Sequence, residues 1–362
     1  MPAAKPKIIF VLNTFGLTGG VKVVFEHANH LAAKGYEVNL IHLLRLRPGI
    51  KNRSAAILKW FKYHLPVANR YFFPPRWFNL RPEIKFSHAL SLKKIPIGAI
   101  VIATANETAD AVNALNIPAA RKFYFVQDYE SWTRDVNEVD RTYSYDLKKI
   151  VISRRLRKLL KDKFNQESFG PVYNGVGDIF LSSAPLSSSP SSSLRGRILL
   201  LYHPAPHKGF NQALAAYGMI KKKWPAAELN VFGAYRLPRK YDSINNFYFR
   251  PTPEKISELY STNDIFIYAA LAEGFALTPL EAMTRGCTVV SSDVGAVAEY
   301  GRNGKSLIVV PPGNPEMLAA AALKLLNDPE ELKAIGIAGR QAAREYSWDK
   351  ASDQLEKILL TA

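Results

Sequence analysis

The stretch RILLLYHPAPHKGFNQALAAYGMIKKKWPAAELNVFG, residues 197–233, decides the fold. An apolar run of strand length is followed by the loop PAPHKG, a helix-length segment and a second strand, ELNVFG. Strand–helix–strand units with short loops build parallel sheets. The same order begins the chain, with KPKIIFVLN at 5–13 and EVNLIHLL at 37–44 on either side of a helical stretch. We therefore predict an α/β fold with two doubly wound parallel-sheet domains facing an interdomain cleft.

A serine-rich segment separates the two repeats. Residues 182–193, SSAPLSSSPSSS, contain too few apolar side chains to bury a core, and this composition is typical of a linker or exposed loop. It divides an N-terminal domain, 1–181, from a C-terminal domain, 194–345. The last segment, 346–362, has a helical pattern, and we expect it to pack back on the N-terminal domain.

The charge of the chain is concentrated in its first half. The net charge is +17, and residues 1–180 hold 28 Lys and Arg against 14 Asp and Glu. A basic half attracts polyanions, which are nucleic acid, an anionic membrane surface or a phosphorylated substrate. Cys287 is the only cysteine, which excludes an internal disulfide framework. No apolar run reaches about 18 residues, so we expect a cytoplasmic protein without a membrane span.

The segment AEGFALTPLEAM, residues 272–283, is the strongest candidate for a binding site. Glu273 follows a predicted strand directly and precedes Gly274, which permits tight backbone geometry. Amides of residues 275–277, at the start of the next helix, form an anion site that the helix dipole reinforces. Glu281 lies on the other side of this turn. Two acids around an anion-binding turn suit a ligand with a phosphate in the middle and hydroxyls at both ends, as in a nucleotide sugar.

Glu281 has a second explanation that involves no ligand. The residues Thr278, Pro279, Leu280 and Glu281 have the spacing of a capping box, with Thr278 as N-cap and proline at the first helical position. The Glu281 carboxylate would then accept a hydrogen bond from the Thr278 backbone amide. Capping and ligand binding are compatible with each other.

At this point the sequence resembles a known family. EGFALTPLEAM resembles the Glu-x7-Glu motif of family 4 glycosyltransferases, retaining enzymes with the GT-B fold of two Rossmann-like domains. Residues 16–38 are similar to the glycine-rich first loop and helix of this family, and 172–180 to the segment that ends its first domain. Residues 259–300 and 304–328 are similar to its second half. FYFVQDYESW, residues 123–132, resembles a branch that contains polysaccharide rhamnosyltransferases.

The resemblance implies a role for each matching residue. Glu273 would contact the hydroxyls of the donor sugar, and Glu281 the ribose hydroxyls. Lys208 would neutralise the leaving diphosphate, whose distal phosphate would bind the amides after Gly274. The implied donor-binding residues are Gly19, Gly20, His203, Gly274, Phe275, Ala276, Leu277, Thr278 and Glu281, and the implied catalytic residues are Glu273, Lys208, Gln127 and Asp128.

The sequence departs from the family pattern in two places. An arginine usually precedes the lysine by five or six residues, where this chain has His203 and Tyr202. Lys208 would then stabilise more of the departing charge, unless a residue such as Arg285 or His207 substitutes. Many relatives have a histidine near the sugar where this chain has Gln127, followed by Asp128. Glutamine can hydrogen-bond a hydroxyl but cannot act as a base.

The stretch 45–82 interleaves aromatic residues with Arg and Lys. This mixture suits a surface that enters anionic headgroups or holds a lipid-linked acceptor. It also suits a partly buried insertion with solvated cations, or stacking on single-stranded nucleic acid. We expect an anionic membrane surface as partner and no nucleic acid. No convincing metal-ligand spacing and no Asp-x-Asp motif occur, so we expect neither metal nor cofactor.

These features together predict a metal-independent retaining glycosyltransferase. It would move a hexosyl or deoxyhexosyl group from a nucleotide sugar to a lipid-linked or polysaccharide acceptor, at the inner membrane face. A relative that binds nucleotide sugar without turnover is one alternative. A basic nucleic-acid-binding protein is another, although it leaves the motif at 272–283 unexplained.

Overall fold

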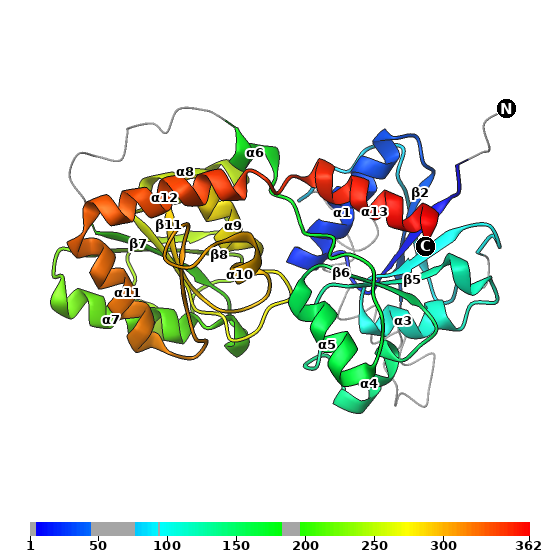
Figure 1. Cartoon of the computed structure of the whole chain (residues 1–362), viewed down its shortest axis with the longest axis horizontal. Helices are drawn as coiled ribbons and strands as arrows, with labels where there is room; N and C mark the ends of the chain where they lie inside the picture. Colours follow the sequence, from blue (N-terminus) through cyan, green and yellow to red (C-terminus); the bar gives the residue numbers. More distant parts are fainter. Residues whose placement is uncertain (1–4, 45–76, 93–94, 183–195) are drawn as a thin grey trace. The chain divides into compact units, whose positions relative to one another are not determined.

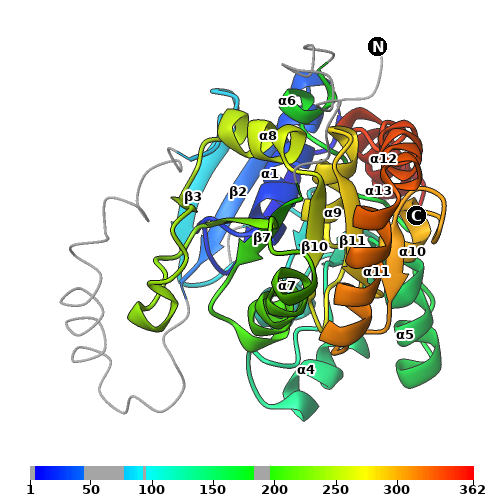
Figure 2. The same ribbon diagram turned by 90° about the vertical axis from the view of Figure 1, so that its left-hand side faces the viewer.

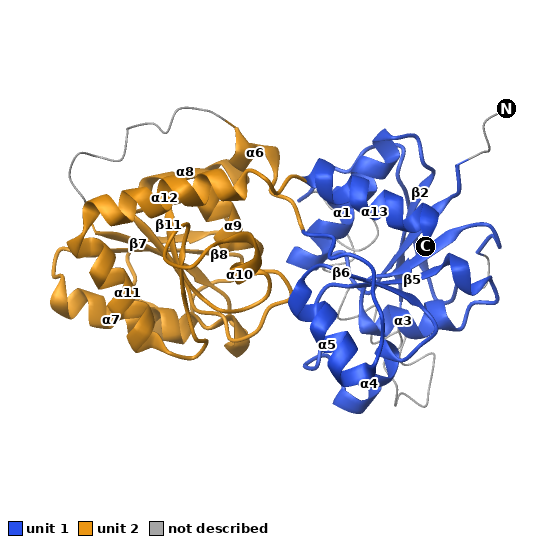
Figure 3. Ribbon diagram, in the orientation of Figure 1, with its two compact units in different colours: residues 1–173, 348–362 blue, residues 174–347 orange. Residues whose placement is uncertain are grey.

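The computed structural model describes residues 5–44, 77–92, 95–182 and 196–362. The chain forms two compact units, one of residues 1–173 with 348–362 and one of residues 174–347 (Figure 3). Apart from Ser182, the serine-rich segment 182–193 lies outside the described residues. The same holds for residues 45–76 of the basic aromatic stretch.

Unit 1 contains a six-stranded parallel sheet in the order β3-β2-β1-β4-β5-β6. Its strands are β1 (Ile8–Leu12), β2 (Val38–Leu43), β3 (Lys85–Ala89), β4 (Ile100–Ala103), β5 (Lys122–Val126) and β6 (Lys148–Val151). Its helical elements are α1 (Gly19–Ala33), α3 (Asn106–Asn113), the short 3-10 turn η1 (Ala119–Arg121), α4 (Val136–Tyr143), α5 (Arg154–Phe164) and α13 (Trp348–Thr361). Strands β1 and β4 are buried along their whole length, as expected for a parallel sheet covered on both faces.

The C-terminal helix α13 packs on α1 and so belongs to unit 1 (Figure 1). Inside the contact, the ring of His27 lies 2.9 Å from the Ser352 hydroxyl, and burial lowers the pKa of His27 to about 3. At its edge, Lys34 donates to Asp353 at 2.5 Å and also to Glu356. A buried neutral histidine and a surface ion-pair cluster therefore hold the two helices together.

This cluster makes the docking of α13 sensitive to acid. Hydrogen bonds from Lys34 and His30 hold the pKa of Asp353 below its ordinary value of 3.8. Its contribution is therefore present above that ordinary value and is lost as the pH falls through the lower folded value. Because Asp353 is largely exposed, we expect Asp353→Asn to lower the free energy of unfolding by about 0.5 kcal/mol at pH 7. Urea unfolding should show this difference shrink as the pH is lowered below 3.8, and an equal difference at pH 7 and at pH 3 would contradict the assignment.

Unit 2 repeats the architecture with a parallel sheet in the order β12-β11-β10-β7-β8-β9. Its strands are β7 (Arg197–Tyr202), β8 (Glu228–Gly233), β9 (Phe247–Phe249), β10 (Ile265–Tyr268), β11 (Thr288–Ser292) and β12 (Ile308–Val310). Its helical elements are α6 (Asp178–Leu181), η2 (Pro206–Lys208), α7 (Phe210–Lys223), η3 (Arg239–Tyr241), α8 (Pro253–Thr262), α9 (Leu277–Thr284), α10 (Val297–Tyr300), α11 (Pro315–Asn327) and α12 (Pro329–Ala343).

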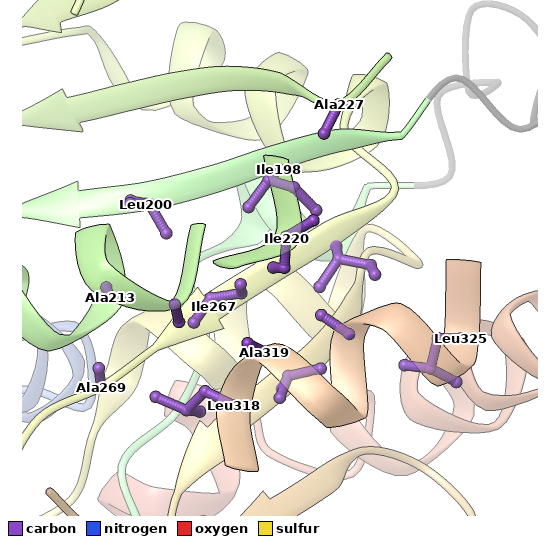
Figure 4. Packing of buried hydrophobic residues seen from close by; sticks show 14 of the residues in the cluster. Ile198, Leu200, Ala213, Ile220, Ala227, Ile267, Ala269, Leu318, Ala319 and Leu325 are labelled. Atoms are coloured by element: carbon purple, nitrogen blue, oxygen red, sulfur yellow. The ribbon is translucent and has the colours of Figure 1, made fainter. Parts of the chain in front are cut away.

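Helices cover both faces of the second sheet. Figures 1 and 2 show α7 and α11 together on one face, and α8, α9 and α12 on the other. In the core under α7 and α11, the side chains of Ile198 and Leu200 from β7 meet Ile220 from α7 and Leu318 from α11 (Figure 4). Each of these four side chains is fully buried.

The prediction of two doubly wound parallel-sheet domains is confirmed. Each sheet runs outward in both directions from a central pair of strands, β1 and β4 in unit 1 and β7 and β10 in unit 2. The strand order reverses at these pairs, and doubly wound sheets bind ligands beyond the carboxyl ends of such strands. The loops after β7 and β10 therefore form the expected ligand-binding edge of the sheet in unit 2. In the described parts of the chain, no helix combines the length and apolarity needed to cross a bilayer.

Candidate functional site

The loop after β7 lies directly against the segment that follows β10. Gly209 has a φ of +68°, and a Cβ atom at this position would stand 1.8 Å from the carbonyl oxygen of Ala269. Only glycine permits this approach, because any side chain would overlap the neighbouring backbone. The amide of Leu271 also donates to the carbonyl of His207 at 2.7 Å. The two loops are therefore joined at the central strands of the sheet.

This packing places Lys208 beside Glu273. The Lys208 ammonium lies 2.7 Å from Oε1 of Glu273, and the hydroxyl of Tyr268, the last residue of β10, donates to the same oxygen at 2.5 Å. The side chain of Glu273 is 11% exposed and that of Lys208 24% exposed. Two predicted catalytic residues, 65 positions apart in the sequence, thus form one ion pair. Burial, followed by the charge of Glu273, raises the pKa of Tyr268, so its hydroxyl stays a donor.

The turn after Glu273 differs from the predicted capping box. Helix α9 begins at Leu277, and its N-cap is Ala276, with φ 69° and ψ 75°. The prediction that Thr278 is the N-cap is wrong, because the left-handed Ala276 starts the helix two residues earlier. Thr278 lies in the first turn instead, and its side chain interacts with the Tyr268 hydroxyl. Glu281 therefore lies beyond the first turn of α9, where its side chain is 7% exposed.

Neighbouring elements hold the strained turn in place. The Tyr300 hydroxyl donates to the carbonyl of Ala276 at 3.0 Å, and the amide of Ala296 donates to the carbonyl of Phe275 at 3.0 Å. Gly295 approaches the Phe275 backbone so closely that a Cβ atom would stand 2.7 Å from its carbonyl carbon. The N-cap residue Ala276 has no polar side-chain atom that could cap the start of α9. The first turn of this helix, reinforced by its dipole, can therefore bind an anion.

The left-handed Ala276 should cost the protein stability. A residue with a Cβ atom loses about 1–2 kcal/mol in this conformation, whereas glycine adopts it freely. After the greater chain entropy of glycine is subtracted, we expect Ala276→Gly to raise the free energy of unfolding by about 0.5–1 kcal/mol. Urea unfolding measures this change. Ala282→Gly, inside the same helix, should instead destabilise, and stabilisation by both changes would contradict the explanation.

The histidines near Lys208 do not replace the missing arginine. His203 follows β7, and its Nδ1 accepts a hydrogen bond from the amide of Ala205 at 3.0 Å. Burial, together with the nearby Lys208 charge, lowers the pKa of His203 to about 4. The same two causes lower the pKa of His207. Both rings are therefore neutral at pH 7, and they can donate or accept hydrogen bonds but add no positive charge.

Arg285 does not supply that charge either. It forms the C-cap of α9, at the opposite end of the helix from Ala276. Its guanidinium donates to the carbonyl of Ser182 at 3.1 Å. The suggestion that Arg285 substitutes for the arginine is therefore wrong, because the length of α9 separates it from the turn.

In unit 1 the predicted residues gather after β1 and β5. Gly19 and Gly20 are the first two residues of α1, and Gln127 follows β5. A Cβ atom on Gly20 would stand 3.4 Å from Nε2 of Gln127, so the glycine loop lies against this side chain. Gln127 also donates to the carbonyl of Thr104 at 3.3 Å. The carboxylate of Asp128 accepts a hydrogen bond from the next amide of the chain at 2.8 Å.

The sequence reasoning missed two polar groups, Tyr268 in unit 2 and Glu130 in unit 1. Tyr268 is the last residue of an apolar strand, and the only sequence signal for it is that its hydroxyl is the one polar side-chain group of that strand. Glu130 lies three residues after Gln127, and its carboxylate accepts hydrogen bonds from the backbone and side-chain nitrogens of Asn106 at 2.7 and 3.0 Å. Burial raises the pKa of Glu130 to about 7. Within the described ranges, no three His, Cys, Asp or Glu side chains cluster closely enough to hold a metal ion.

Comparison with known sequences gives a family match in unit 2. Residues 195–342, most of unit 2, match the family model described as Glycosyl transferases group 1. The whole chain is similar to an uncharacterized glycosyltransferase of Haemophilus influenzae, with 24% identity over 98% of this chain and 99% of that protein. D-inositol 3-phosphate glycosyltransferase of Streptomyces bingchenggensis is 32% identical over 106 residues, which are 29% of this chain. The match spans 23% of that enzyme's length.

Solved structures share the fold over the full chain. Sucrose-phosphate synthase from Thermosynechococcus elongatus superposes with a TM-score of 0.74 at 16% identity, covering 98% of both chains. Anabaena HepE, solved in complex with UDP-glucose, gives a TM-score of 0.70 at 14% identity, covering 98% of this chain and 100% of HepE. These similarities, with the family match, support a glycosyltransferase with the GT-B fold. The rhamnosyltransferase-like branch stays a prediction.

Proposed function

We propose that this protein is a retaining glycosyltransferase that moves a hexosyl or deoxyhexosyl group from a nucleotide sugar to a lipid-linked or polysaccharide acceptor. The observation that carries the proposal is the ion pair of Lys208 with Glu273 beside the strained turn at Ala276. It lies at the strand-order reversal of unit 2, inside the segment that matches the glycosyltransferase model.

Each group at this site has a task in the proposed reaction. Glu273 accepts hydrogen bonds from the donor sugar and orients it. The Lys208 ammonium and the amides at the start of α9 stabilise the charge on the departing diphosphate, as preorganised donors do most effectively. The bond between the anomeric carbon and the diphosphate oxygen breaks, and the acceptor hydroxyl oxygen bonds to the anomeric carbon on the face that the leaving group vacates. The proton of that hydroxyl passes to the departing diphosphate oxygen.

Further residues complete the proposed set. Glu281 would accept from the ribose hydroxyls, and His203 would serve the donor as a neutral hydrogen-bonding group. In unit 1 we assign Gln127 and Asp128 to catalysis and the loop of Gly19 and Gly20 to the donor. The proposal uses an ammonium and backbone amides where other transferases use a metal ion, so it needs no metal or other cofactor.

The proposed location is the inner face of a membrane. Its support is the charge of the first half of the chain and the aromatic residues interleaved with cations in the stretch 45–82. Sedimentation of the full chain with vesicles tests it. Binding to vesicles that contain anionic lipid, but not to neutral ones, is expected, and equal recovery with both would contradict it.

A panel of ligands tests the proposed function. UDP, GDP, ADP and dTDP are each added to the protein while its melting temperature is followed. The correct nucleoside diphosphate should stabilise the fold by about 2.7 kcal/mol at a concentration 100 times its Kd. The matching nucleotide sugars are then assayed for release of nucleoside diphosphate. If none of the four stabilises the protein and no donor is consumed, the proposal fails.

One observation favours a second candidate, a protein that binds nucleotide sugar without turnover. His203 and His207, the two histidines beside Lys208 in the described part of the chain, are neutral at pH 7, so neither adds a positive charge to that of Lys208. Less positive charge then opposes the negative charge that develops on the diphosphate. The same panel separates the two candidates, since this one shows stabilisation by a nucleotide sugar and no release of nucleoside diphosphate.

A further inference from the structure

Oxygen Oε1 of Glu273 accepts two hydrogen bonds from different elements. Tyr268, at the end of β10, donates at 2.5 Å, and Lys208, from the loop after β7, donates at 2.7 Å. Both donors therefore lie on the same side of the carboxylate. They fix its rotation and leave its second oxygen, Oε2, as the atom available to a ligand.

The two donors have different tasks in the proposed reaction. In the proposed function Lys208 also binds the leaving diphosphate, whose negative charge competes with Glu273 for the same ammonium. Lysine is a point charge on a flexible stem, so its contact with Glu273 weakens as the ammonium turns toward the phosphate. Without another donor, Glu273 would lose its orientation in the step that requires it most.

Burial and strand pairing fix the position of the Tyr268 side chain. Its side chain is 5% exposed and packs against Phe266 on the same strand, with ring centroids 6.0 Å apart. Its backbone belongs to β10, which pairs with β7 and β11 on either side. A tyrosine side chain has only two torsions, so the hydroxyl is held by the central strand of the sheet. The Thr278 side chain, in the first turn of α9, also interacts with this hydroxyl.

We propose that Tyr268 is a positioning residue, which keeps the Glu273 carboxylate oriented toward the donor sugar while the Lys208 ammonium turns to the diphosphate. The inference rests on the proposed function, and it assigns a residue that the Glu-x7-Glu motif does not contain.

The test is the variant Tyr268→Phe, which removes one oxygen atom and keeps the packing of the ring. A hydrogen bond to a charged group contributes about 1.5–3 kcal/mol, so we expect kcat for transfer to fall about 10- to 100-fold. The affinity for the nucleoside diphosphate selected by the panel of UDP, GDP, ADP and dTDP should change less than twofold. In the unchanged protein the sugar group should make the nucleotide sugar bind more tightly than the nucleoside diphosphate. In Tyr268→Phe this difference in Kd should disappear, and measuring it needs no turnover.

Tyr217→Phe is the matched control. Tyr217 lies on α7, and its hydroxyl donates to the carbonyl of Ala227 at 3.2 Å. This variant therefore loses a hydrogen bond that supports the fold and lies outside the proposed site. It should keep kcat and both affinities within twofold of the unchanged protein.

An unchanged kcat and an unchanged sugar affinity in Tyr268→Phe would overturn the inference. A parallel loss of nucleoside diphosphate binding would also overturn it, because Tyr268 would then support the turn as a whole. Failure of the proposed function is seen separately, as the absence of binding and turnover in the unchanged protein.

Discussion

Replacing Glu273 with glutamine is expected to lower the rate of transfer about 10³-fold, at the upper end of what one preorganised polar group contributes. The amide keeps the size of the carboxylate but has one acceptor oxygen and no charge. Tyr268 and Lys208 both donate to Oε1 of Glu273, so the single amide oxygen would have to serve them while the NH2 group faces the sugar. A donor group cannot accept the hydroxyl bonds that the carboxylate oxygen accepts. The rate is measured with the nucleotide sugar that the ligand panel selects.

Glu258→Gln provides the comparison. Glu258 is an exposed carboxylate on α8 that pairs with Lys255, and it lies outside the site. Its loss should leave the transfer rate within twofold. Both variants should unfold in urea close to the midpoint of the unchanged protein, which shows that the effect of Glu273→Gln is chemical. If Glu273→Gln retains a tenth of the rate or more, Glu273 does not orient the sugar as proposed.

The sheets could be predicted from the sequence because their pattern is local. The segment that became β7, α7 and β8 consists of apolar runs of strand length around a helical stretch, with glycine where the loop meets the helix. The matching order of the first half follows from the same rule. Parallel strands buried on both faces have few polar residues, so their limits are clear in the sequence.

The start of α9 shows where local reasoning stops. The residues from Thr278 to Glu281 satisfy a capping box in every position, and yet the helix begins at Leu277. Tertiary contacts decide where the helix begins, because Tyr300 bonds to the left-handed Ala276 and Gly295 packs against the backbone of Phe275. Neither contact partner is near in the sequence. The role of Tyr268 could not be predicted for the same reason, because it depends on the hydrogen bond that its hydroxyl donates to Glu273 in the folded protein.

The charge state of the site could not be predicted from the sequence either. His203 was a candidate donor-binding residue at the position of an arginine, and only its burial beside Lys208 shows that it is neutral at pH 7. The identities of Lys208 and Glu273 were predicted, but their contact requires the close approach of Gly209 to Ala269. That approach is a property of two loops 60 residues apart, and a side chain added at position 209 would disturb it.

Gly209→Ala is expected to destabilise unit 2 by about 3 kcal/mol and to abolish binding of nucleoside diphosphate. The new Cβ atom would stand 1.8 Å from the carbonyl oxygen of Ala269 and 2.4 Å from its carbonyl carbon. Overpacking costs about 1–3 kcal/mol, and the left-handed conformation at φ +68° adds about 1–2 kcal/mol for a residue with a Cβ atom. The backbone must move to relieve the overlap, and Lys208, the preceding residue, moves with it. Urea unfolding measures the first effect, and the ligand panel measures the second.

Gly218→Ala separates this effect from the general cost of replacing a glycine. Gly218 lies inside α7, nine residues further along the same segment, and a Cβ atom there would meet nothing within 4 Å. Alanine is the better helix former, so this variant should gain about 0.5–1 kcal/mol and bind nucleoside diphosphate as before. A loss in Gly209→Ala larger than the about 1–2 kcal/mol of the left-handed conformation is expected only if the loop at 209 rests against the carboxyl end of β10. If Gly209→Ala unfolds at the urea midpoint of the unchanged protein, the loops do not meet in this way, and nothing then holds Lys208 against Glu273.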